Sequence, residues 1–105
     1  MADAVEVHVT MPDKERATAL ARTLLEEGLA ACVNIIPGVT SLYRWDGQLQ
    51  EDSEVLCLIK TRSVVFERTR ARILELHPYE VPEIIAFTVA DGSAAYLAWV
   101  KKSTP

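Results

Sequence analysis

Glycine, cysteine, histidine and positive charge are all scarce in this 105-residue sequence, and each shortage excludes a class of protein. The 4 glycines are scattered, so the sequence contains no glycine-rich loop of the kind that binds phosphate. Lys and Arg number 11 against 15 Asp and Glu, which gives a formal charge of −4. That balance argues against nucleic acid as a partner, because phosphate binding needs a surplus of cationic side chains.

Long apolar runs are missing as well. No stretch approaches the roughly 18 consecutive apolar residues that a membrane helix needs, so we expect no membrane partner. The first four residues hold neither a basic nor an apolar segment, so we predict no secretory signal and a cytoplasmic protein. No Ser-His-Asp or Cys-His constellation is evident around the 2 histidines, so we predict that the protein is not an enzyme.

What the sequence does contain is a clear order of elements. Residues 4–10 alternate with valines on one face, which predicts a half-buried strand with Glu6, His8 and Thr10 on the other face. Apolar residues at helical spacing follow over 17–25, and Gly28 is placed to end that helix. A second helix is predicted from a Ser63 cap to about residue 76, then a strand over 81–89 and a short terminal helix. With the central hairpin described next, the order is β-α-β-β-α-β plus a helix, a ferredoxin-like α+β fold in a single domain over residues 1–105.

The central segment predicts a β-hairpin of unusual length. Residues 29–45 and 48–61 read as its two arms, joined by Asp46-Gly47, a strong two-residue turn signal. Pro37-Gly38 interrupts the first arm, which predicts a bulge on an edge strand. Because ordinary strands have five or six residues, these arms extend beyond any sheet that the domain can supply. We therefore expect the far end to pair with other copies of the chain.

The turn also sets the register of the two cysteines. If Trp45 faces Gln48, then Cys57 faces Ile36 and Cys32 faces Thr61, which separates the cysteines by about four residues along the strands. A disulfide needs Cα atoms within about 7 Å. Both cysteines are therefore interpreted as small buried apolar residues.

Three runs of residues point to a family. They are LAACVNIIPGVTSLYRW at 29–45, EVLCLIKT at 54–61 and HPYEVPEI at 77–84. Together they resemble the CutA family, the divalent-cation-tolerance proteins, and the resemblance spans nearly the whole chain. It implies a very stable homotrimer, similar in architecture to the PII signalling proteins, and a link to copper and other divalent metals. A copper-ligand set proposed in the family falls here on Val9, Leu76 and Glu83, so only Glu83 of that set is retained.

His77, Glu80 and Glu83 form the best local cluster of metal ligands. Imidazole and carboxylate suit Cu(II) or Zn(II), although a tight site usually has three or four protein ligands. The alternative is that His77 closes the preceding helix and that Glu83 accepts a hydrogen bond in a turn. His8 with Glu6 is a second metal candidate.

Aromatic residues near the turn suggest a second kind of site. Tyr43, Arg44, Trp45 and Tyr79 are expected either to pack at a subunit interface or to line a small-ligand pocket there. The sequence therefore predicts a homotrimer in divalent-cation tolerance that binds Cu(II) or another divalent cation weakly. The alternative is a PII-like regulatory or scaffold trimer that binds a small anion, a metabolite or a partner protein in clefts between subunits.

Overall fold

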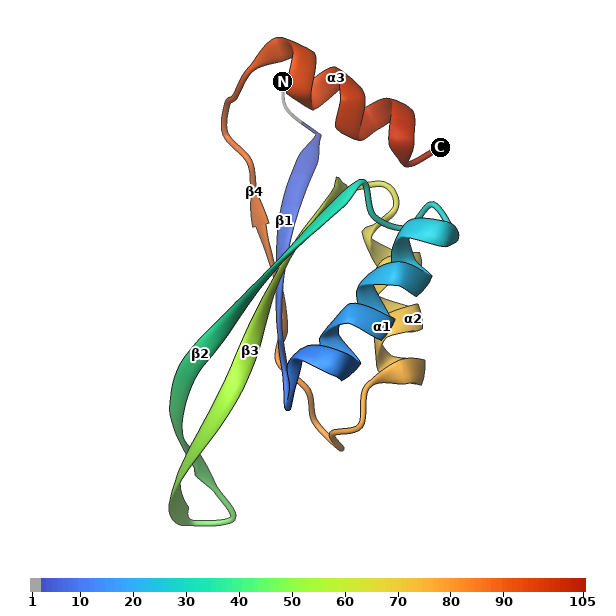
Figure 1. The fold of residues 1–105 in the computed structure, drawn as a ribbon. Coiled ribbons are helices and arrows are strands. Elements are labelled where there is room, and N and C mark those ends of the chain that lie inside the picture. Colours follow the sequence, from blue (N-terminus) through green and yellow to red (C-terminus); the bar gives the residue numbers. More distant parts are fainter. Residues whose placement is uncertain (1–2) are drawn as a thin grey trace.

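The alternating segment near the start of the chain becomes β1 (Ala4–Met11), an inner strand of a four-stranded sheet with the order β2-β3-β1-β4 (Figure 1). In this computed structural model, which describes residues 3–105, the other elements are α1 (Lys14–Glu26), β2 (Cys32–Trp45), β3 (Gln48–Arg62), α2 (Phe66–Leu76), β4 (Ile84–Thr88) and α3 (Ala94–Ser103). Met1 and Ala2, which belong to the stretch that predicts no secretory signal, lie outside the described residues. All neighbouring strands are antiparallel, so the predicted ferredoxin-like α+β fold is confirmed.

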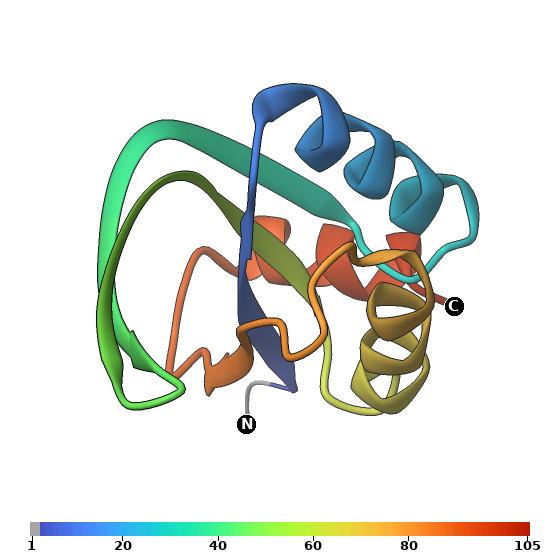
Figure 2. The same ribbon diagram turned by 90° about the horizontal axis from the view of Figure 1, so that it is seen from below.

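The core lies between one face of the sheet and the helices α1 and α2 (Figures 1 and 2). Side chains alternate between the two faces of a strand, so Val5, Val7 and Val9 all point toward the helices, where they are almost completely buried. The apolar stripe of α1 meets them through Leu20 and Leu24. Asp13 caps α1 by accepting a hydrogen bond from the Arg16 backbone N–H at 2.8 Å.

The third helix covers one end of the sheet. Val100 of α3 packs with Ala4 and Ala31 in a second, smaller buried cluster. Arg62 of β3 fixes the end of the chain, because its guanidinium donates to the Thr104 carbonyl oxygen at 3.0 Å and 2.6 Å. Among residues 3–105, no helix has the length and apolar character needed to cross a membrane.

The hairpin has the predicted turn and bulge. Asp46 and Gly47 both have positive φ, as a type I′ turn requires. The strand register shifts by one residue between Ile36 and Val39, where Gly38 adopts a φ of +80° and β2 forms the edge of the sheet. That shift pairs Cys57 with Ile35 and Cys32 with Lys60, so the two cysteines stay apart and both are free, as predicted.

The hairpin also extends beyond the sheet. Pairing between β1 and β3 ends at Met11 with Val55, so the distal hairpin (39–54) pairs only with itself (Figure 1). Its apolar residues stay in contact with solvent: the exposed fraction is 61% for Leu42, 47% for Trp45 and 78% for Leu49. A long exposed apolar hairpin is the feature from which we predicted self-association.

Three predicted boundaries were wrong. The first hairpin strand begins at Cys32 instead of residue 29, because Leu29, Ala30 and Ala31 form a buried connection from α1. The second helix begins at Phe66 after Val65, and Ser63 makes no side-chain cap. The last strand begins at Ile84 instead of residue 81, because Pro82 has no N–H to give to a neighbouring strand.

Thr61 offers a test of the core. Its side chain is fully buried, and within residues 3–105 its hydroxyl has no hydrogen-bond partner. A buried hydroxyl without a partner is destabilising, so Thr61→Val should raise the free energy of unfolding by about 1 kcal/mol. The matched variant is Thr69→Val, because the equally buried Thr69 hydroxyl donates to the Leu29 carbonyl oxygen at 2.8 Å. Urea denaturation should show opposite signs for the two variants, and a loss of stability in Thr61→Val would refute the assignment.

Candidate functional site

A cleft of about 740 Å³ opens where the distal hairpin meets the end of β1 and the loop between α2 and β4. The hairpin contributes Tyr43, Trp45, Asp52 and Glu54, and β1 contributes Thr10. The loop contributes residues 79–83, among them Tyr79, Glu80 and Glu83. The cleft therefore brings together three segments that lie far apart in the sequence.

His77 holds the loop against the sheet. Its backbone N–H closes α2 by donating to the Ile73 carbonyl oxygen at 2.8 Å. Its Nε2 lies 2.8 Å from the Thr10 carbonyl oxygen, and its Nδ1 lies 3.1 Å from the Tyr79 backbone nitrogen. A carbonyl oxygen can only accept and a backbone N–H can only donate, so Nε2 carries the proton and Nδ1 accepts. The imidazole is neutral, buried and occupied on both nitrogens.

Tyr79 extends this chain of contacts to β3. Its hydroxyl donates to Glu54 Oε2 at 2.7 Å, and its ring packs on His77 with the centroids 4.8 Å apart. Glu54 is buried, with an exposed fraction of 7%. Burial and then the hydrogen bond to Glu54 raise the pKa of Tyr79 well above its ordinary value, so the phenol stays protonated and keeps donating.

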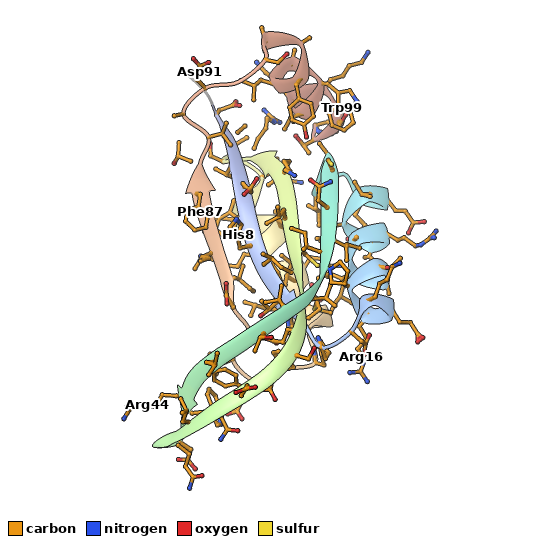
Figure 3. The ribbon with its side chains drawn as sticks, turned by 60° about the vertical axis from the view of Figure 1, so that its left-hand side comes forward. His8, Arg16, Arg44, Phe87, Asp91 and Trp99 are labelled. Atoms are coloured by element: carbon orange, nitrogen blue, oxygen red, sulfur yellow. The ribbon has the colours of Figure 1, made fainter. Side chains whose placement is uncertain are left out.

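A second phenol and carboxylate lie on the hairpin itself. Tyr43 donates to Asp52 Oδ2, and this hydrogen bond raises the pKa of the Tyr43 phenol. Trp45 lines the same cleft, so three of the four predicted aromatic-site residues are brought together. Arg44 is not among the lining residues, and its side chain points outward from the tip of the hairpin (Figure 3).

The predicted metal ligands are only partly brought together. Glu80 and Glu83 both line the cleft, whereas His77 lies behind it with both nitrogens engaged. For His77 to bind a metal, it would have to release one of its two hydrogen bonds. Over residues 3–105, no three His, Cys, Asp or Glu side chains are grouped so that they could hold a metal ion within one chain. The residues therefore do not fit a complete metal site.

The other candidate ligands are engaged elsewhere. His8 Nε2 lies 2.8 Å from Glu6 Oε2, and its ring packs beside Phe87 on the open face of the sheet (Figure 3). Burial raises the pKa of the Cys57 thiol to about 11, which keeps it protonated at neutral pH and makes it a poor metal ligand. The interpretation of Cys57 as a buried apolar residue agrees with this, while Cys32 is only half-buried.

Sequence reasoning missed Asp52, Glu54 and Thr10 as residues of the site. Asp52 and Glu54 belong to a polar run, 51–54, in which nothing local marks one carboxylate as buried. The only sequence signal is that positions 52 and 54 share a strand face, on which they pair with Ser41 and Val39. The packing of the 77–83 loop, which local patterns do not reveal, encloses Glu54.

Comparison with known proteins identifies the family of the chain. Residues 5–103 match the family described as CutA1 divalent ion tolerance protein. The chain belongs to the CutA1 family. The divalent-cation tolerance protein CutA of Thermus thermophilus is 49% identical over 98 residues, which are 93% of this chain and 95% of that protein. Its solved structure superposes with a TM-score of 0.95 at 47% identity and covers 97% of this chain and 99% of that one.

Some other CutA1 proteins are longer than this chain, and one is described as periplasmic. Protein CutA of Homo sapiens is 47% identical over 96 residues, which are 91% of this chain but 54% of that protein. The chain thus spans about half the length of its mammalian relative. A solved CutA of Archaeoglobus fulgidus, described as periplasmic, has a TM-score of 0.94 at 33% identity and covers 97% of this chain and 99% of that one.

Proposed function

We propose that this CutA1 protein is a homotrimer that serves divalent-cation tolerance without catalysis and binds a divalent cation such as Cu(II) weakly. The observation that carries the proposal is the acidic cleft beside an unpartnered apolar hairpin. Family names support the link to divalent cations, and the two free cysteines favour a reducing compartment, the cytoplasm. The match of the cleft to a metal is incomplete, so we expect weak binding.

We propose that identical chains associate through the distal hairpin. It has no pairing partner within the described chain beyond its own two strands, and its apolar side chains are exposed. Symmetric association of identical chains would cover such a surface with one repeated contact. Three copies in a PII-like arrangement is the form that the resemblance implies, and it would place the cleft near a subunit boundary.

Glu80 and Glu83 are the proposed oxygen ligands, with His77 as a conditional nitrogen ligand. Two carboxylates without a free imidazole bind Cu(II) less tightly than a mixed nitrogen and oxygen set would, and two ligands are fewer than a tight site needs, so we expect weak binding. Calorimetric titration of the untagged protein with Cu(II) or Zn(II) should give weak but saturable binding at a fixed ratio to the chain. Glu80→Gln and Glu83→Gln should each weaken it several-fold, because each removes one anionic ligand.

Two variants make this titration decisive. Glu26→Gln removes an exposed carboxylate from the end of α1, outside the cleft, and should leave metal binding unchanged. His77→Gln retains an amide N–H that can reach Thr10, so weaker metal binding in a His77→Gln protein that still folds cooperatively would identify the imidazole as a ligand. Heats that do not saturate and are the same in every variant would refute the metal site.

A second candidate function is supported by the size of the cleft. A volume of about 740 Å³ is within the range of small-molecule pockets, roughly 300–1,000 Å³, and its walls combine aromatic and charged groups. On this proposal the protein is a PII-like regulator or scaffold whose ligand, a small molecule or a segment of a partner protein, binds between subunits. Tyr43, Trp45 and Tyr79 are the proposed contact residues, and Arg44 would contribute only to the interface.

A further inference from the structure

All charged side chains that line the cleft are negative. Its lining includes four carboxylates, those of Asp52, Glu54, Glu80 and Glu83, and no lysine, arginine or histidine. Across residues 3–105, the ion pairs involve other carboxylates, and none includes any of these four. A small anion would therefore meet repulsion here and no cationic partner. The structure thus disfavours the anion among the ligands that the sequence left open.

The carboxylate of Glu54 lacks a positively charged partner in the cleft. The residue is more than nine-tenths buried, and one carboxylate oxygen receives the Tyr79 hydroxyl. The other oxygen, Oε1, makes no hydrogen bond with the described residues, and it is not one of the fully buried atoms that lack a partner, so it remains in contact with solvent. Burying a carboxylate is unfavourable unless a positive charge or enough donors surround it. A single phenol is an incomplete shell, so a cation that enters the cleft would be stabilised at this oxygen.

The aromatic walls indicate the kind of cation. Ring faces attract ammonium and guanidinium groups, with tryptophan the strongest, and the cleft contains Trp45, Tyr43 and Tyr79. Both tyrosine hydroxyls already donate to carboxylates, so neither is free to donate to an acceptor on a ligand. A bare divalent metal instead needs several oxygen ligands at short, fixed distances and gains little from aromatic rings.

We propose that the cleft binds a small organic cation, an ammonium or guanidinium compound. Its charged head group contacts the free oxygen of Glu54 and the carboxylate of Asp52, and its carbon skeleton packs on Trp45 and Tyr43. This inference rests on the second proposed function, that the cleft is a small-ligand site. It adds the sign of the ligand's charge and the chemical class of the ligand.

The test uses the assembled protein and four probes of known charge. Choline and agmatine represent quaternary ammonium and guanidinium cations, 3,3-dimethylbutan-1-ol is the neutral isostere of choline, and succinate is the anion. Calorimetry should show saturable binding of at least one of the two cations, with no binding of the alcohol or succinate at the same concentrations. Excess Cu(II) or Zn(II) in a parallel titration shows whether metal competes for the same carboxylates.

Three single substitutions locate the binding. Glu54→Gln keeps an oxygen that accepts from Tyr79 but removes the charge, and it should weaken cation binding about tenfold or more. Asp52→Asn changes an exposed side chain, should fold normally, and should weaken binding in the same direction. The matched control is Glu51→Gln, which removes the same charge from the neighbouring position, outside the cleft lining. It should leave binding unchanged.

The outcomes separate this inference from the function on which it rests. Cation binding that is lost with Glu54→Gln and Asp52→Asn but kept with Glu51→Gln supports both. Binding of succinate in place of the cations would overturn the inference and leave a small-ligand cleft standing. If no probe binds up to about 10 mM, the inference fails, and failure of metal to bind as well would remove the cleft from both proposed functions.

Discussion

Replacing Trp45 by glutamate is expected to convert the proposed homotrimer into monomers. The indole has an exposed fraction of 47% within one chain and lies at the end of the distal hairpin, which pairs with no other strand among residues 3–105. A tryptophan at the centre of an interface typically contributes about 2–4 kcal/mol, and each trimer would lose three of them. The substitution also places three carboxylates where apolar surfaces meet. Sedimentation velocity should report the mass of one chain, 11.7 kDa, at micromolar concentration.

The control for this variant carries the same charge elsewhere. Ala19→Glu adds a carboxylate to an exposed position of α1, which lies on the layer opposite the open face of the sheet (Figures 1 and 2). It should remain trimeric, because added charge by itself does not separate subunits whose contact is elsewhere. If the wild type and Trp45→Glu both sediment as trimers, the hairpin is not the interface. A monomeric wild type would refute the proposed assembly itself.

Replacing His77 by alanine is expected to lower the free energy of unfolding by about 2–4 kcal/mol. The imidazole supplies the hydrogen-bond partner of the Thr10 carbonyl oxygen and of the Tyr79 N–H, and it packs against the Tyr79 ring. Its removal leaves two backbone groups without partners and opens a cavity between β1 and the loop. Urea denaturation of the wild type and the variant at one protein concentration measures the difference.

The same loss would disturb the cleft, because Tyr79 positions its hydroxyl on Glu54. A fall in metal or ligand binding in His77→Ala therefore does not identify a ligand. His77→Gln is the informative comparison, since its side-chain amide can donate to Thr10 in place of Nε2, and it should regain part of the lost stability. If His77→Ala unfolds at the wild-type urea concentration, the anchoring role is refuted.

The fold was predictable because its signals are local. Alternation over 4–10 and helical spacing over 17–25 each depend on neighbouring residues alone, and the structure has β1 and α1 there. Asp46-Gly47 and Pro37-Gly38 placed the turn and the bulge for the same reason, since both dipeptides restrict the backbone directly. The predictions failed at the strand starts at 29 and 81, where buried packing and Pro82 decide where pairing begins.

The candidate site was only partly predictable. Aromatic residues beside a hairpin turn suggested a surface site, and the structure brings Tyr43, Trp45 and Tyr79 to one cleft. The metal cluster was inferred from spacing in 77–83, but spacing does not show which nitrogens of an imidazole are free. The occupation of both nitrogens of His77 became visible only in three dimensions.

The sequence by itself determined the types of element, the long hairpin and its turn, because steric and periodic rules act between residues that are close in the chain. Only the tertiary structure decided the chemistry of the cleft. The bond from His77 to Thr10 joins residues 67 positions apart, and the bond from Tyr79 to Glu54 spans 25. Burial and charge depend on such distant contacts, so the negative charge of the cleft and the anchoring of the loop by the His77 imidazole followed from folding and not from any local motif.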